Sequence, residues 1–167
     1  YNERQRVEIA LVKSPEPDEA YGVGNNGEIF DVTFGLYAET DLTAADGTVI
    51  PADGLIEIIS LDENGKGTVN SDLPFGSYYV KELSTNSAYV LNEQKYPVHF
   101  EYAGQDTAVV HLSANDSEAV ENEIIYGSVS GLKSDEDGNA LGGAVIGIFK
   151  AGTEEFTKEN AIQTTTS

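Results

Sequence analysis

A lysine stands where the surrounding pattern calls for an apolar side chain. Residues 7–14 read VEIALVKS, and their alternation is typical of a β-strand with one buried face. The buried row holds Val7, Ile9 and Leu11. Lys13 is its next member. Burial disfavours the charged form of an amine and lowers its pKa, and a neutral amine is a nucleophile. The strand therefore carries a candidate nucleophile on its buried face.

Two more polar residues lie in the apolar rows of other predicted strands. Glu82 is in phase with Tyr78 and Val80 in the stretch GSYYVKEL. Asn122 is in phase with Val120. An isolated charge in such a place would be very costly, so burial favours the neutral form of a glutamic acid. A neutral carboxyl group can donate a hydrogen bond to an amide carbonyl and polarise it.

The same pattern allows a simpler interpretation. Lys13 would extend from the end of its strand until the ammonium group reaches solvent, and would form an ordinary salt bridge with Glu82. A reactive lysine would instead be shielded from water, and Phe34 or Tyr37 are aromatic residues that could provide the shield. The two interpretations therefore differ in the burial that they require.

The elements expected around these residues are short β-strands. Stretches rich in Val, Ile, Tyr and Phe are separated by turn dipeptides, and no segment of useful length shows a convincing helical period. The stretch 55–73 reads as two strands around the turn sequence DENG. The turn dipeptides are Asn26-Gly27, Asp46-Gly47, Asp53-Gly54, Asn64-Gly65 and Asp137-Gly138. This pattern predicts an all-β, immunoglobulin-like sandwich.

An internal repeat indicates how the chain is organised. Asn2 precedes Lys13 by 11 positions, and Asn122 precedes Lys133 by the same 11. Each Asn is followed by Glu and each Lys by Ser. We therefore interpret the chain as a tandem array of three parts: the tail of a preceding module (1–6), a complete module (7–124) and the N-terminal part of a second module (127–167).

The composition excludes several kinds of partner and site. The chain has 29 acidic and 9 basic residues, and a net charge of −20 would repel nucleic acid and anionic membranes. It has no Cys and no apolar run that could span a membrane. His99 and His111 are the only histidines and fall on separate predicted strands, so we expect no metal site, and no motif indicates a cofactor. Because Tyr1 is not an initiator Met, we interpret the chain as a piece of a longer protein.

Several stretches together resemble a known family. They are the strand with Lys13, VTFGLYAETD, LDENGKGTVNSDLPFGSYYVKEL, AYVLNE and the closing strand with Asn122. The sequence resembles the B-type repeat domains of Gram-positive surface proteins, namely collagen-adhesin B-type and SpaA-like pilin domains. The resemblance covers residues 7–124 and the opening of 127–167, and it implies a prealbumin-like fold.

The resemblance also implies a spontaneous intramolecular isopeptide bond. The amine of Lys13 would attack the side-chain carbonyl of Asn122, ammonia would leave, and Glu82 would transfer protons as the acid/base. Asn115 or Asp116 could serve as the acceptor instead, although neither closes a strand in the right phase.

The repeat and the resemblance together predict a structural stalk or adhesin module of a bacterial cell-surface protein. It would be extracellular, anchored to the cell wall through regions outside this chain, and its partners would be neighbouring modules. It would be no enzyme beyond a single reaction on itself. Lys133 and Asn2 would be the equivalent cross-linking residues of the second and preceding modules. The alternatives are a module that binds a glycan or host protein through the 14–30 insertion, and an accessory β-sandwich of a secreted enzyme.

Overall fold

The computed structural model describes residues 4–167, so Asn2 lies outside the described residues. The chain forms two compact units, with the boundary between Ile125 and Tyr126. Two single-turn 3-10 helices, η1 (Glu28–Asp31) and η2 (Ala114–Ser117), accompany the strands. The strands are β1 (Arg6–Pro15), β2 (Thr33–Ala38), β3 (Leu42–Thr43), β4 (Val49–Ile50), β5 (Leu55–Ser60), β6 (Lys66–Val69), β7 (Gly76–Ser84), β8 (Tyr96–Phe100), β9 (Val109–Ser113), β10 (Val120–Asn122), β11 (Val145–Ile148) and β12 (Gln163–Thr166). The all-β prediction is confirmed.

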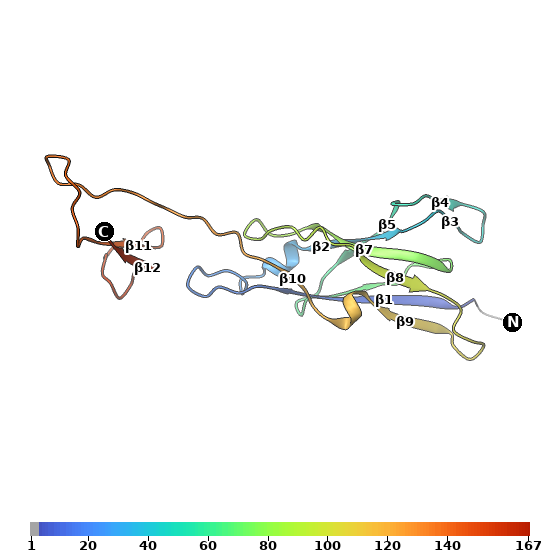
Figure 1. Ribbon diagram of the computed structural model, residues 1–167. Coiled ribbons are helices and arrows are strands. Elements are labelled where there is room, and N and C mark those ends of the chain that lie inside the picture. The colour runs from blue at the N-terminus through green and yellow to red at the C-terminus, as the bar shows by residue number, and fades with distance from the viewer. Residues whose placement is uncertain (1–3) are drawn as a thin grey trace. The chain divides into compact units, whose positions relative to one another are not determined.

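β1 is the central strand of the first sheet, and two strands share one of its edges. β6 pairs with β1 antiparallel on one side, and β9 and β10 both pair with it in parallel. β9 runs beside Arg6–Ala10, whereas β10 runs beside Lys13–Pro15 (Figure 1). Between them lies η2, in which Asn115 and Asp116 have φ values of 54° and 51°. These left-handed residues turn the chain aside and return it to the same edge, where β10 carries Asn122.

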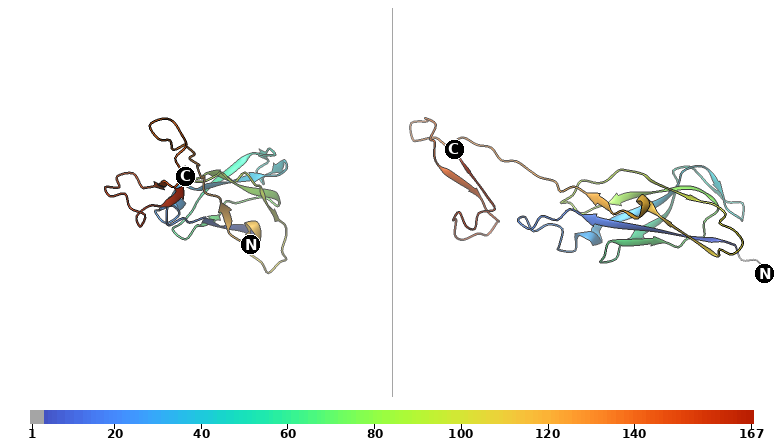
Figure 2. Two further views of the ribbon diagram at one scale, coloured as in Figure 1. Left: turned by 60° about the vertical axis from the view of Figure 1, so that its left-hand side comes forward. Right: turned by 60° about the horizontal axis from the view of Figure 1, so that its bottom comes forward.

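The second sheet has the order β5-β2-β7-β8, and all of its pairings are antiparallel. It packs on the first sheet to form a sandwich, along which β1 extends (Figure 2). The core between the sheets is formed by the inward-facing residues of the strands, as the alternation of apolar and polar residues in the sequence predicts. Those rows include Val7, Ile9 and Leu11 of β1, Phe34 and Leu36 of β2, and Tyr78 and Val80 of β7. Lys13 and Glu82 continue two of these rows.

The turn sequence DENG connects the two sheets instead of closing a hairpin. Both expected strands are present, but β5 belongs to the second sheet and β6 to the first. Asp62 Oδ1 accepts hydrogen bonds from the backbone N–H groups of Asn64 and Lys66, at 2.8 and 2.9 Å. Gly65 has a φ of +71°, and its carbonyl accepts a 2.7 Å hydrogen bond from the backbone N–H of Lys13. The turn therefore lies directly against the backbone of Lys13.

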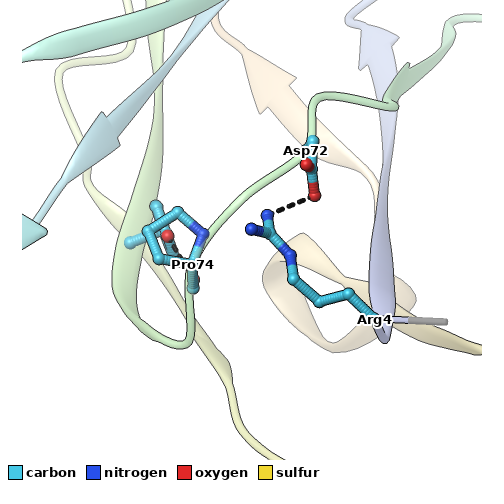
Figure 3. A network of polar contacts seen from close by, with 4 residues as sticks. Arg4, Asp72 and Pro74 are labelled. Atoms are coloured by element: carbon cyan, nitrogen blue, oxygen red, sulfur yellow. Dashed lines mark hydrogen bonds and ion pairs between the residues drawn. The ribbon is translucent and has the colours of Figure 1, made fainter. Parts of the chain in front are cut away.

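Polar contacts tie the beginning of β1 to neighbouring loops. The guanidinium group of Arg4 pairs with the carboxylate of Asp72 (Figure 3). The side-chain amide of Gln5 is buried and donates to the carbonyls of Gly104 and Thr107, at 2.5 and 2.7 Å. Both ends of β1 are thus anchored, since its other end pairs with β10. Across residues 4–167, the structure contains no helix with the length and apolar character that spanning a membrane requires.

Residues 126–167 contain one hairpin, in which β11 and β12 pair antiparallel. Residues 127–133, which include Lys133, form no strand, and the adjacent Leu132 is fully exposed. The Nζ atom of Lys133 donates only to the carbonyl of its neighbour Ser134, at 3.4 Å. A strand needs partners for its backbone groups, and no described strand pairs with this segment.

Candidate cross-linking site

Lys13, Glu82 and Asn122 are all buried inside the sandwich. Their exposed fractions are 2%, 1% and 3%, and among the described residues Gln5 is the only other buried polar residue. They come from three different strands, β1, β7 and β10. The described ion pairs include none that joins Lys13 to Glu82. Lys13 therefore does not extend into solvent, and the simpler interpretation of a surface salt bridge with Glu82 does not hold for the described residues.

The register of β1 and β10 places the amine and the side-chain amide on one face. Lys13 lies opposite Val120, and Asn122 is two residues further along β10. Because side chains alternate along a strand, residues 120 and 122 point to the same side. The Nζ atom of Lys13 donates a 2.8 Å hydrogen bond to the carbonyl oxygen of Val120. The amine is thus held beside the strand that carries the acceptor.

Glu82 contacts the nitrogen of the Asn122 amide. Nδ2 of Asn122 donates to Oε2 of Glu82 at 2.8 Å and to the carbonyl oxygen of Val90 at 2.6 Å. The backbone N–H of Asn92 donates to the same Glu82 Oε2 at 2.8 Å. Oε1 of Glu82 and Oδ1 of Asn122 are buried and have no hydrogen-bond partner among the described residues.

This arrangement differs from the expectation that Glu82 donates a hydrogen bond to the amide oxygen of Asn122. The difference has a local cause, because the Val90 carbonyl is an acceptor and requires the amide nitrogen to face it. Glu82 lies on that same side and therefore accepts from the nitrogen. In this orientation the carboxyl group of Glu82 faces the nitrogen of the Asn122 amide and not its oxygen.

Aromatic side chains exclude water around Glu82. Phe34 lies opposite Glu82 in the register of β2 and β7 and is fully buried. Tyr96 is also buried, and its hydroxyl group accepts a 2.9 Å hydrogen bond from the side chain of Asn92. Burial raises the pKa of Tyr96, and the nearby Glu82 charge acts in the same direction. Tyr37, the other aromatic residue considered from the sequence, stacks on Tyr79 at a centroid distance of 5.0 Å.

The contacts from Val90 and Asn92 could not be assigned from the sequence. The stretch AYVLNE contributes to the family resemblance, but the groups that touch the site are main-chain atoms, which leave no residue-type signal. Tyr96 did carry a signal, because it is in phase with Val98 in YPVHF. Asn115 and Asp116 lie in η2, and the Asn115 side chain donates to the carbonyl of Glu118 at 3.3 Å, not to the site.

Burial lowers the pKa of Lys13 to about 8, although the charges of Glu82 and Glu121 act in the opposite direction. Most of the amine is therefore protonated at neutral pH, and the neutral fraction grows as pH rises toward 8. Nζ has one hydrogen-bond acceptor among the described residues, whereas an ammonium group has three N–H donors. The contacts around Nζ therefore satisfy only one of the three donors of the charged form, in line with the lowered pKa.

We predict that cross-linking accelerates with pH. If Glu82 acts as the base, the reactive pair is that base with the neutral amine of Lys13, and the rate should rise about tenfold per pH unit below the Lys13 pKa of about 8 and level off above it. Full-length chain recovered from inclusion bodies in denaturant can be diluted into buffers from pH 5.5 to 9 and followed by intact mass. A rate that is flat at low pH and falls above 8 would instead mean that the reactive carboxyl group is protonated.

The chain matches a known family of domains. A family model described as SpaA, prealbumin-like fold domain, matches residues 22–116, which is more than half of the chain. The chain belongs to this family. Domains of the family are structural modules, so the chain is a structural module and not an enzyme. The matched region contains Glu82 but neither Lys13 nor Asn122, and the pairing of those two residues therefore rests on the geometry above.

The prealbumin-like chain is also similar to solved structures. The match to the Bacillus anthracis TIE protein covers 98% of this chain and 26% of the TIE chain, with 17% identity and a TM-score of 0.55, so the two share the fold. The T6 backbone pilin of serotype M6 Streptococcus pyogenes matches 56% of this chain and 16% of its own, with 22% identity and a TM-score of 0.35. The match to GBS52, the minor pilin of Streptococcus agalactiae, covers 75% of this chain and 48% of the GBS52 chain, with 20% identity and a TM-score of 0.43. The chain spans less than half the length of each, and no curated protein matches it.

Proposed function

We propose that the chain is a stalk module of a Gram-positive cell-surface protein, stabilised by an autocatalytic isopeptide bond between Lys13 and Asn122. The observation that carries the proposal is the joint burial of an amine, a carboxyl group and a side-chain amide at one place between the sheets. Burying such groups is costly unless another interaction offsets the loss of hydration. A covalent bond that removes the amine's charge provides one.

The reaction requires only the three side chains. The neutral Nζ of Lys13 attacks Cγ of Asn122, and a new C–N bond forms. The proton released from Nζ passes to the carboxylate of Glu82, which then donates it to Nδ2 across the existing 2.8 Å contact. The Cγ–Nδ2 bond breaks, and Nδ2 leaves as ammonia. Glu82 ends as it began, so it acts as acid/base and is not consumed.

The bond would protect the module under tension. It would join the first and last strands of residues 7–124, which are parallel neighbours. A pulling force that enters through β1 would then leave through β10 across the bond, and the residues between them would not carry the load. Such a bond would also explain how an extracellular module is stabilised without cysteine.

The intact mass of the purified chain tests this proposal. Condensation with loss of ammonia lowers the mass by about 17 Da, and peptide mapping should recover a branched peptide that contains Lys13 and Asn122. A chain with the full unreacted mass after complete folding would refute the proposed bond.

Removal of the carboxyl group should stop the reaction. In Glu82→Gln the side chain keeps its size but cannot shuttle a proton, so we expect the cross-linking rate to fall at least about a hundredfold. The matched control is Glu57→Gln on β5, which lies in the same sheet but does not pair with β7, and this variant should react at the native rate. If Glu82→Gln still loses ammonia at that rate, the assigned role of Glu82 is wrong.

The proposal extends to the rest of the chain. Residues 127–167 would be the N-terminal part of a second module, in which Lys133 corresponds to Lys13, and Asn2 would be the acceptor of a preceding module. The stretch IGIFK at 146–150 corresponds in this scheme to FGLYA at 34–38. The partners would be neighbouring modules of the same protein, and the location would be the outside of the cell, with cell-wall anchoring through other regions.

A further inference from the structure

A short segment outside the regular strands contacts both the acceptor and the acid/base. It consists of residues 88–92, which lie between β7 and β8, and is named the 88–92 segment. Its Val90 carbonyl accepts from Nδ2 of Asn122 at 2.6 Å, and its Asn92 N–H donates to Oε2 of Glu82 at 2.8 Å. One stretch of backbone therefore touches the two groups between which a proton must pass.

The Val90 contact determines which end of the Asn122 amide faces Glu82. Nδ2 has two hydrogens, and Val90 and Glu82 each accept one of them. With the amide reversed, Oδ1 would take the place of Nδ2 beside the Val90 carbonyl oxygen, and two acceptors would face each other. The main chain thus directs the leaving nitrogen toward Glu82.

The 88–92 segment is itself fixed to the acceptor strand. Val90 N–H donates to the carbonyl of Glu123 at 2.9 Å, and Ile125 N–H donates to the carbonyl of Ala88 at 2.8 Å. Tyr89 and Ile124 form an antiparallel bridge between these bonds. The chain just after Asn122 therefore holds the segment in register.

Glu16, just beyond β1, joins the same assembly. Its backbone N–H donates to the Asn122 carbonyl at 3.3 Å, and its carboxylate accepts from Ile124 N–H at 3.0 Å. The hydroxyl group of the buried Tyr89 donates to the Glu16 carbonyl at 2.8 Å. Three segments that are distant in sequence thus meet around Asn122.

We propose that Tyr89 and Glu16 are positioning residues that lock the 88–92 segment, so that the Val90 carbonyl presents the Asn122 nitrogen to Glu82 as the leaving group. This inference rests on the proposed isopeptide bond. Neither residue touches the reacting atoms. Their effect is to fix the amide orientation in which the proton taken from Lys13 can be returned to the nitrogen that departs as ammonia.

Kinetics of the full-length chain provide the first test. Tyr89→Phe removes only the hydroxyl group, and Glu16→Ala removes the acceptor for Ile124 N–H. Each should slow the loss of ammonia after dilution from denaturant by about tenfold or more, because misplaced reacting groups lose rate steeply. The matched controls are Tyr102→Phe and Glu19→Ala, whose side chains are exposed and take no part in this contact set.

Nuclear magnetic resonance of an unreactive chain provides the second test and separates positioning from general stability. In Lys13→Met, Nδ2 of Asn122 should show a scalar coupling through the hydrogen bond to the carbonyl carbon of Val90. That coupling should weaken or disappear when Tyr89→Phe is added, while the rest of the spectrum stays folded. Native rates in both variants, or absence of the coupling in Lys13→Met, would overturn the positioning role. A native chain that never loses ammonia would instead refute the bond itself.

Discussion

Lys13→Met should restore the full unreacted mass and lower the free energy of unfolding by about 4–5 kcal/mol. Methionine is unbranched, only one atom shorter than lysine and suited to a buried site, so the change removes the amine without leaving a large cavity. Residues 13–122 enclose a loop of about 110 residues, and closing such a loop restricts the unfolded chain as a disulfide of that span does. Urea denaturation of both chains, with intact mass as the parallel readout, measures the two effects together.

Lys133→Met is the matched control, because Lys133 is exposed and no described strand pairs with its segment. It should leave the mass deficit intact and the free energy of unfolding within about 0.5 kcal/mol of the native value. If Lys13→Met kept the lower mass, another lysine would have to be the nucleophile. If it restored the mass but left stability unchanged, the bond would exist without the entropic effect that the loop length predicts.

The burial of Lys13, Glu82 and Asn122 could be predicted because a strand has a strict period of two. Once Val7, Ile9 and Leu11 define an inward row, Lys13 must belong to it, whatever the rest of the chain does. The same argument held for Glu82 in β7 and Asn122 in β10. The presence of each strand, and the face of the strand on which its polar residue lies, can therefore be predicted from the local sequence.

Which strands pair with one another depends on residues far apart in the chain, and the sequence pattern did not predict it. The turn DENG carries a hairpin signal, yet it sends β5 and β6 to different sheets, because the choice depends on which strands are free to pair. The break at η2, which lets β9 and β10 share one edge of β1, depends on left-handed residues that are not glycine. The contacts of Val90 and Asn92 use main-chain atoms. Each of these features is set by tertiary pairing and leaves no mark on residue periodicity.

The orientation of the Asn122 amide shows how such a non-local contact changes the chemistry. From the rows alone, a neutral Glu82 that polarises the amide oxygen was a reasonable expectation. The Val90 carbonyl reverses the amide, and Glu82 then faces the amide nitrogen, which is the leaving group of the proposed reaction. The pH profile predicted above distinguishes the two roles, because a carboxylate base requires the rate to rise toward the pKa of Lys13, whereas a protonated acid requires it to fall beyond that value.

Gly65→Ala should be among the most damaging single substitutions in the chain, with a loss of about 3–5 kcal/mol in the free energy of unfolding. A Cβ atom at this position would lie 2.1 Å from the carbonyl oxygen of Lys13, and that oxygen belongs to the backbone of a central strand. The φ of +71° adds the cost of a left-handed residue with a side chain. Either the turn or β1 must move, and the backbone hydrogen bond from Lys13 to Gly65 would be strained or lost.

Gly47→Ala separates the two causes, because Gly47 has a similar φ of +84° but no atom within 4 Å of the position that a Cβ would occupy. It should cost only about 1–2 kcal/mol, which is the effect of the backbone conformation alone. Both substitutions are best compared by urea denaturation in the Lys13→Met chain, so that the covalent bond does not mask the difference. Equal losses would show that the turn can withdraw from Lys13 freely. A larger loss for Gly65→Ala, together with slower cross-linking when Lys13 is restored, would show that the turn holds the nucleophile in place.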